Sequence, residues 1–315
     1  MKFAFKMKNI LVTGATGFLG SHIAEELVNQ GFNVIALKRS TSNLWRCESF
    51  KDQIKWINCD IITDAEPEIF KCKPEVIIHA AWNGVKSSDR DNWVEQEKNV
   101  SFFVSLLEIA RKAKISKIIA LGSQAEYGNF EGSINEEYPC NPNSAYGAIK
   151  LCISILLKSF AEQNKIDWYW IRIFSVFGPR EELNWLLPAT INNLLEKKEM
   201  GLTPCEQRYD YLFTKDFAAG ILNIAKNNKD NSGTYIISSS KSIKLKDILS
   251  FLENKISPQL KLLKFGALPY RPHQVMHMEG NSDRFFQTFN FQPKYDLNNA
   301  LVETINYYIN LRNNE

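Results

Sequence analysis

The chain has 315 residues, a formal net charge of +3, a hydrophobic fraction of 44% and a charged fraction of 23%. These values are typical of a soluble globular protein with one large domain or two closely packed ones, and the small net charge argues against nucleic-acid or membrane-surface partners. No apolar run approaches the roughly 20 residues of a membrane span, and no signal-peptide core is present near Met1. We therefore expect a cytoplasmic protein.

The cysteines and histidines do not indicate a metal site. The six cysteines are far apart in the sequence, which fits reduced thiols better than a disulfide framework or a zinc site. His273 and His277 are four residues apart, but Pro272 argues against a regular helix, and no cysteine or carboxylate cluster accompanies them. We expect no bound metal.

The first predicted elements form a phosphate-binding pattern. A short buried strand, Ile10–Thr13, leads into the turn Gly14-Ala-Thr16-Gly17-Phe18-Leu19-Gly20, and apolar residues from 19 to 27 give the next segment a helical face. Glycines permit a tight turn and let backbone amides approach a pyrophosphate at the positive end of the helix. The alternative is a glycine turn without a ligand, but a strand before it and a helix after it favour a dinucleotide site.

The end of the second strand, Asn33–Leu37, indicates which dinucleotide is bound. A carboxylate here accepts from a ribose 2′-hydroxyl, whereas an arginine accommodates a 2′-phosphate. The chain continues Lys38-Arg39-Ser40-Thr41-Ser42, without an acid. Arg39, supported by Ser40, therefore favours NADP(H) over NAD, with a solvated basic loop as the alternative.

Strands and helices continue to alternate. Further strands are predicted at 54–58, 76–81, 118–121 and 168–174, with helical patterns between them. Such repeated units predict an α/β fold with a doubly wound parallel sheet. At the strand ends, Ala80 and Ala81 are small enough for a cofactor to lie close, and Asp60 is suited to bond an adenine amino group, although an exposed turn aspartate is the alternative.

The stretch from Leu121 to Lys150 carries the predicted chemistry. Ser123 follows a buried strand, and Tyr146 and Lys150 lie one helical turn apart, about 6 Å along the axis. The alternative is an amphipathic helix with an exposed tyrosine and lysine. An ammonium at that distance is worth roughly 3 kcal/mol and is expected to lower the phenol pKa from about 10 to about 8. A second Tyr-x-x-x-Lys copy, Tyr211 to Lys215, has strand character and is interpreted as coincidence.

Regular alternation ends after Phe177. We predict two domains, a dinucleotide-binding domain over residues 1–177 that carries the serine, tyrosine and lysine, and a smaller α/β domain over 178–315. Arg208 and Arg271 in the second part suit a diphosphate if they converge, although spacing alone favours two surface arginines.

Together these segments resemble the extended short-chain dehydrogenase/reductases, the NAD-dependent epimerase/dehydratase family acting on nucleotide sugars. The resemblance implies a Rossmann sheet with a smaller domain that binds the nucleotide sugar. The matching segments occur in the family's order: Thr13–Gly20, Asp60-Ile61, Ile78–Ala81, Asn99-Val100, Ser123–Gly128, Tyr146–Lys150, Arg172–Pro179, Arg208–Asp216 and Arg271-Pro272.

The resemblance also implies roles for individual residues. Ser123, Tyr146 and Lys150 correspond to the catalytic residues, and the late arginines to residues that contact the nucleotide diphosphate. Ser175 replaces a substrate-binding asparagine of the family, and Trp82, Gln124 and Leu186 are expected to shape substrate choice. The expected cofactor-binding residues are Gly14, Thr16, Gly17, Phe18, Leu19, Gly20, Arg39, Ser40, Asp60, Ile61, Ala80, Ala81, Asn99, Tyr146 and Lys150.

The reaction class is narrowed by residues that differ from the family pattern. Nucleotide-sugar 4,6-dehydratases place an Asp-Glu pair after the catalytic hydroxyl residue, but Gln124 and Ala125 stand here, and Glu126 comes one residue late. The cysteine that GDP-fucose-forming enzymes use after the serine is also absent. The words Ala81-Trp82 and Tyr270-Arg-Pro look most like CDP-abequose-synthase-type reductases.

We therefore expect NADPH-dependent reduction of the 4-keto group of a nucleotide-linked 6-deoxyhexose. A net reductase draws reducing equivalents from the cytosolic NADPH pool and so benefits from Arg39, which can bind the 2′-phosphate. An epimerase has no such need, because it re-reduces its substrate with the nicotinamide that it already holds. The alternatives are a nucleotide-sugar 4-epimerase with bound NAD and a non-catalytic NADP-binding regulator. Homodimerisation through the helix after Asn99 and the Tyr146 helix is the family's habit and is expected here.

Overall fold

The structure is a computed structural model that describes residues 8–86 and 88–313. Its residue contacts define two compact units. The first comprises the described residues within 1–129, 138–173 and 218–235, and the second those within 130–137, 174–217 and 236–315. The main change from the first unit to the second falls at residue 174. In addition, residues 130–137 belong to the second unit, and residues 218–235 belong to the first. A functional division at residue 177 stays a prediction.

The first unit is built on a seven-stranded sheet with the order β11-β7-β5-β4-β1-β2-β3. The strand pairs from β7 to β3 are parallel, so the predicted α/β class with a doubly wound sheet is confirmed. The strands are β1 Asn9–Thr13, β2 Asn33–Lys38, β3 Lys55–Asn58, β4 Val76–His79, β5 Lys117–Leu121, β7 Asp167–Ile173 and β11 Gly233–Ile237.

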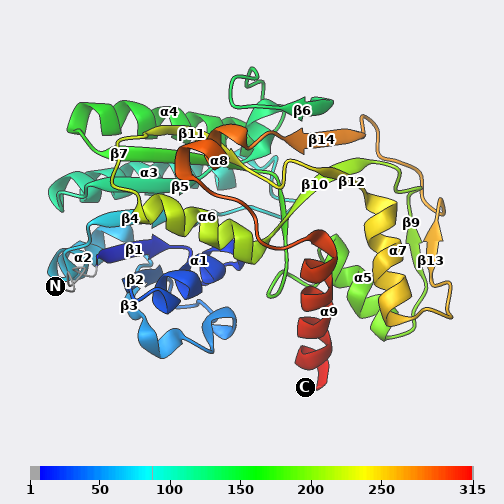
Figure 1. Ribbon diagram of the computed structural model, residues 1–315. Helices are drawn as coiled ribbons and strands as arrows, with labels where there is room; N and C mark the ends of the chain where they lie inside the picture. Colours follow the sequence, from blue (N-terminus) through cyan, green and yellow to red (C-terminus); the bar gives the residue numbers. More distant parts are fainter. Residues whose placement is uncertain (1–7, 87, 314–315) are drawn as a thin grey trace. The chain divides into compact units, whose positions relative to one another are not determined.

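Helices follow most of these strands, because β1, β2, β4 and β5 are buried nearly throughout and need cover on both faces. Alternate strand residues such as Leu11, Ile77 and Ile118 form one core with apolar residues of α2, α3 and α4. Helices α3 and α4 pack against each other, while α1 packs on β1 and β2 (Figure 1). The elements are α1 Phe18–Asn29, α2 Glu66–Cys72, α3 Trp93–Lys112, α4 Ala145–Asn164, α6 Thr214–Lys226 and the 3-10 turns η1 Trp45–Cys47, η2 Lys51–Gln53, η3 Ile62–Ala65 and η4 Gln124–Tyr127.

The second unit contains short strands and a separate core. One sheet has the order β12-β10-β14-β6, with β8 also paired to β10, and β13 pairs with β9. Leucine and isoleucine side chains of α5, α7 and α9 form its core. The elements are β6 Gly132–Ile134, β8 Ser175–Phe177, β9 Met200–Leu202, β10 Arg208–Phe213, β12 Ser242–Lys244, β13 Leu263–Phe265, β14 His277–Gly280, α5 Leu186–Leu195, α7 Leu245–Ile256, α8 Asp283–Phe289 and α9 Leu297–Asn313.

Two features are absent from the residues that the structure describes. None of their helices is long and apolar enough to cross a membrane. Within the same residues, no group of three or more histidine, cysteine, aspartate or glutamate side chains is placed to hold a metal ion.

Candidate functional site

The glycine turn after β1 is shaped by close backbone contacts. Gly14 has φ +74°, and a Cβ on it would lie 2.5 Å from the backbone nitrogen of Ala81. A Cβ on Gly20 would lie 2.0 Å from the carbonyl oxygen of Gly14. Both contacts exclude a side chain, so the first glycine forms the tight turn and the last lets α1 pack closely on it. The predicted structural roles of these glycines fit this geometry.

The beginning of α1 is suited to bind an anion. Its N-cap is Gly17, which provides no side-chain cap, and no acidic residue stands in its first turn. The first backbone N–H groups therefore remain oriented toward the carboxyl edge of the sheet, where the helix dipole favours negative charge. Thr16, Phe18 and Leu19 lie at this helix end, so the residues present fit a dinucleotide pyrophosphate.

The turn after β2 exposes Arg39 and is held by short polar contacts. The Arg39 N–H donates to Ser42 Oγ at 3.0 Å, and Ser40 donates its backbone N–H and its hydroxyl to Asp60 Oδ1 at 3.0 and 3.1 Å. Asp60 thus fixes the basic turn, and its contact with an adenine stays a prediction. The neighbouring Ile61 is 61% exposed, which leaves its side chain accessible to a ligand.

The segment after β4 closes the next part of this edge. The Ala80 and Ala81 backbone N–H groups donate to the carbonyl and hydroxyl oxygens of Thr13. The buried Asn99 accepts the Asn83 N–H at 2.8 Å and donates to the Asn83 carbonyl at 3.2 Å. Asn99 therefore orders the loop that follows the two alanines, and a direct contact with the cofactor stays a prediction.

Ser123 begins the η4 turn at the end of β5. Its hydroxyl accepts the Ala125 N–H at 3.2 Å, and the Glu126 carboxylate accepts the Ser123 N–H at 2.8 Å, a reciprocal capping box. The Glu126 side chain also accepts hydrogen bonds from Trp170 and Arg172. It is therefore committed to a buried network, which agrees with the prediction that it does not replace a dehydratase acid.

Tyr146 is brought to Ser123 by close packing between α4 and η4. Ser144 caps α4 by accepting the Gly147 N–H at 3.1 Å. A Cβ on Gly147 would lie 2.3 Å from the Ala125 carbonyl oxygen, so glycine permits this approach. The side chains of Ser123 and Tyr146 are hydrogen-bonded to each other.

Lys150 is buried beside the aromatic rings of Trp82, Tyr146 and Trp170. Its Nζ donates to the Leu121 carbonyl at 2.6 Å and lies 3.5 Å from the ring centroid of Trp82 and 5.8 Å from that of Tyr146. Burial lowers the pKa of Lys150 to about 7, although the charge of Glu126 acts in the opposite direction. The structure therefore brings Ser123, Tyr146, Lys150 and the predicted substrate residue Trp82 together.

The predicted acidification of Tyr146 is wrong for this structure. Burial raises the pKa of Tyr146 above its usual 10, although its hydrogen bond to Ser123 and the charge of Arg90 act in the opposite direction. Lys150 has little acidifying effect because its own pKa is about 7, so its charge is incomplete at neutral pH. The phenol is therefore protonated at neutral pH and is able to donate.

The predicted substrate residues are divided between the two units. Trp82 and Gln124 belong to the first unit, whereas the second unit contains Ser175 on β8, Leu186 at the start of α5, Arg208 on β10 and Arg271 before β14.

The two arginines of the second unit each have a described partner. Arg208 Nη2 donates to the Ser242 carbonyl at 2.8 Å, and its charge acts on Lys244. The charge of Arg271 acts on Tyr209, the residue after Arg208 on β10. A joint contact of Arg208 and Arg271 with a diphosphate stays a prediction.

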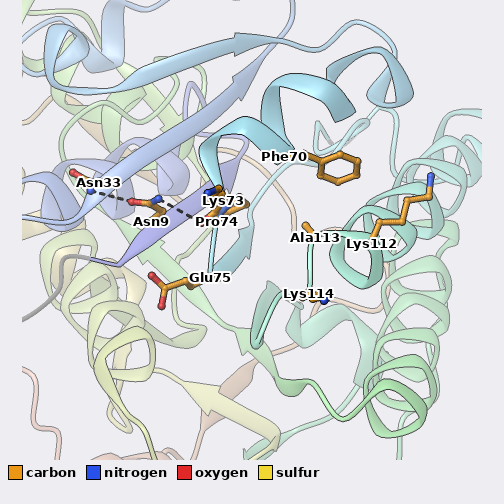
Figure 2. A pocket seen from close by; sticks show the side chains of 9 residues that line it. All are labelled: Asn9, Asn33, Phe70, Lys73, Pro74, Glu75, Lys112, Ala113 and Lys114. Atoms are coloured by element: carbon orange, nitrogen blue, oxygen red, sulfur yellow. Dashed lines mark hydrogen bonds between the residues drawn. The ribbon is translucent and has the colours of Figure 1, made fainter.

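A cavity of about 710 Å³ lies at the other edge of the sheet. Figure 2 shows its lining side chains, which come from the beginnings of β1 and β2, the segment before β4 and the ends of α2 and α3: Asn9, Asn33, Phe70, Lys73, Pro74, Glu75, Lys112, Ala113 and Lys114. Ligands of open parallel sheets bind at the carboxyl ends of the strands. We therefore do not assign the reaction to this cavity.

The comparisons with known proteins define the family. The NAD dependent epimerase/dehydratase family matches residues 10–238, which is most of the chain, and the chain belongs to this family. This agrees with the resemblance seen in the sequence motifs.

Two distant relatives match most of the chain. A CDP-abequose synthase from Salmonella muenchen is 26% identical over 281 residues, covering 87% of this chain and 89% of the relative. A putative UDP-glucose 4-epimerase from Methanocaldococcus jannaschii is 26% identical, with coverages of 96% and 98%.

A crystal structure of a mutant UDP-glucuronic acid 4-epimerase from Bacillus cereus, in complex with a fluorinated UDP-sugar and NAD, superposes with a TM-score of 0.86. It is 24% identical and covers 96% of this chain and 99% of its own. At this identity the likeness shows a common fold.

Proposed function

We propose that this chain is a cytoplasmic enzyme that reduces the 4-keto group of a nucleotide-linked 6-deoxyhexose with NADPH. The observation that carries this proposal is the grouping of Tyr146 with Ser123, to which it is hydrogen-bonded, and with Lys150 one helical turn further on. A phenol whose pKa lies above its usual 10 is loaded with the proton that a reduced ketone needs. The similarity to a CDP-abequose synthase supports the same class of substrate.

The residues of the carboxyl edge support the cofactor assignment. The glycine turn and the uncapped start of α1 would hold the pyrophosphate, and the exposed Arg39 would pair with a 2′-phosphate. When bound there, NADPH supplies the hydride. Asp60 is an acidic residue beside the Arg39 turn, and its carboxylate accepts two hydrogen bonds from Ser40.

The side chains of the site then have separate tasks. Ser123 orients the ketone oxygen through its hydroxyl. Tyr146 donates its proton to that oxygen as negative charge develops, and the Lys150 ammonium stabilises the resulting phenolate. Gln124 and Ala125, in the positions where dehydratases have acids, support reduction without dehydration.

A 4-epimerase with bound NAD is the second candidate. It is favoured by the similarity to a putative UDP-glucose 4-epimerase and by the NAD-bound epimerase of like fold. An epimerase retains its nicotinamide through the cycle, whereas a reductase exchanges it after each turnover.

The test measures NADPH oxidation by the purified protein against 4-keto-6-deoxyhexoses linked to CDP, dTDP, UDP and GDP. We expect protein free of nicotinamide absorbance that oxidises NADPH with at least one of these substrates. Tightly bound NAD, with interconversion of UDP-sugars and no net NADPH oxidation, would establish the epimerase instead.

We also propose a homodimer formed through α3 and α4. Val104 on α3 and Ile155 on α4 are 44% and 61% exposed, although these two helices pack together. Sedimentation should show a dimer that Ile155→Lys dissociates and that Leu260→Lys, a change at an exposed leucine of the other unit, does not. A monomeric wild-type protein would refute the dimer.

A further inference from the structure

A buried carboxylate stands next to the backbone of Ser123. Glu126 has no exposed surface, and it accepts hydrogen bonds from Ser123 N–H at 2.8 Å, Trp170 Nε1 at 2.9 Å and Arg172 Nε at 2.8 Å. The three donors come from the η4 turn and from β7. One side chain thus ties the turn that presents Ser123 to the neighbouring strand β7.

The position of Arg172 is fixed from its other side. Its Nη1 donates to the Tyr127 hydroxyl at 2.9 Å, and its Nη2 donates to Cys140 Sγ at 2.9 Å. An apolar side chain in place of Glu126 would leave the Ser123 and Trp170 N–H groups and a buried guanidinium without this acceptor. The arrangement therefore requires an acceptor at Glu126, and its ion pair with Arg172 favours a negative one.

The charge of Glu126 also reaches the proton-handling pair. It raises the pKa of both Tyr146 and Lys150. The other groups that face this pair are Ser123 and Arg90, which act on Tyr146, and His79, whose pKa burial and the charge of Lys150 lower to about 3. His79 is therefore neutral at working pH, which leaves Glu126 as the negative charge acting on Lys150.

We propose that Glu126 is a positioning residue of this site, which fixes the backbone of Ser123 and places a buried negative charge beside Tyr146 and Lys150. The inference rests on the proposed reduction and adds a residue that touches neither ketone nor cofactor. A residue that merely stabilised the fold would not determine the pH at which the activity falls.

The test compares the pH dependence of kcat in wild type and Glu126→Gln. The amide keeps an acceptor but loses the charge, so we expect kcat to fall roughly tenfold. Reduction needs Tyr146 and Lys150 protonated, so activity falls as pH rises through their pKa values. Without the charge of Glu126 both values are lower, and the alkaline limb should move to lower pH.

Two further variants separate charge from stability. Glu126→Gln leaves the buried Arg172 without its partner, so Glu126→Gln with Arg172→Gln removes both charges and should fold more readily. The alkaline limb of this double variant should also move to lower pH. Tyr127→Phe is the control, because it removes a bond to Arg172 without touching Ser123. The alkaline limb of Tyr127→Phe should lie at the same pH as that of the wild type.

A titration without substrate keeps this inference distinct from the proposed function. The carbon-13 resonance of the Lys150 side chain, assigned by its loss in Lys150→Arg, reports the ammonium directly. We expect its midpoint at lower pH in Glu126→Gln than in wild type. Unchanged midpoints in both charge-removing variants would overturn the role of Glu126. A wild type that reduces no ketone while the midpoint shifts would instead refute the proposed reaction.

Discussion

At the scale of single residues, the site is defined by the protonation states of a phenol and an amine. Burial keeps Tyr146 protonated and lowers the pKa of Lys150 to about 7. The amine is held by the Leu121 carbonyl and by the face of Trp82, and the contact with Trp82 favours the charged form. Substitutions here should therefore change proton transfer more than cofactor binding.

Replacing Tyr146 by phenylalanine removes the proton donor and keeps the ring. We expect kcat to fall roughly a thousandfold, the size of a general-acid contribution. NADPH affinity, measured by fluorescence titration, should stay within about threefold of wild type because the ring contacts remain. Tyr138→Phe, at an exposed tyrosine, is the control. Substantial residual turnover would remove Tyr146 from its role.

Replacing Arg39 by aspartate tests the cofactor assignment. The lost charge-assisted hydrogen bonds should raise KM for NADPH roughly tenfold to a hundredfold and leave KM for NADH nearly unchanged. Lys38→Ala is the matched control, since the Lys38 amine is already bound to Asn58 Oδ1 at 2.8 Å. Equal effects of Arg39→Asp on both cofactors would contradict the assignment.

Lys150 should also make stability depend on pH. Its pKa is about 7 in the folded protein and 10.5 ordinarily, so between these values the unfolded chain binds more protons. The free energy of unfolding of wild type relative to Lys150→Met should therefore rise with pH in this window, by up to about 1.4 kcal/mol per pH unit. Urea unfolding of both proteins across the window tests this, and a flat difference would contradict a buried, depressed lysine.

At the scale of elements, the sequence identified those with strong periodicity. Strands β1 to β5 and β7 lie within a residue or two of their predicted positions, because buried apolar runs between turns are distinctive. The three-residue strands of the second unit were not found, since they are too short to show a period. The sequence analysis missed the Glu126 network. Two signals pointed to it: Ser123-x-x-Glu126 matches the capping-box pattern, and Arg172 is a charged residue within a buried strand.

The contact between α4 and η4 depends on Gly147. Gly147→Ala would put a methyl group 2.3 Å from the Ala125 carbonyl oxygen and force the helix away from the Ser123 turn. We expect a loss of roughly 1–3 kcal/mol in the free energy of unfolding and about a tenfold lower kcat. Ala148→Gly, which costs about 1 kcal/mol in a helix, is the control. Equal kcat values in these two variants would show that the close approach does not position Tyr146.

At the scale of the whole molecule, the sequence motifs gave the family and the doubly wound sheet, both confirmed. The sequence does not reveal that each unit is built from several separate segments. Residues 130–137 and 218–235 join their units through contacts between residues that are distant in the chain. Nor could the sequence reveal that Arg208 is engaged with Ser242, since strand register and facing are set by tertiary pairing.

The most direct test of the proposed reaction follows the hydride itself. The protein is incubated with a 4-keto-6-deoxyhexose nucleotide and NADPH deuterated at its transferable position, and the sugar product is analysed by mass spectrometry and NMR. Stoichiometric deuterium at the sugar C4, together with one NADP⁺ formed per sugar reduced, is the predicted result. A product without deuterium, or an altered sugar without NADP⁺ formation, would contradict a net reductase.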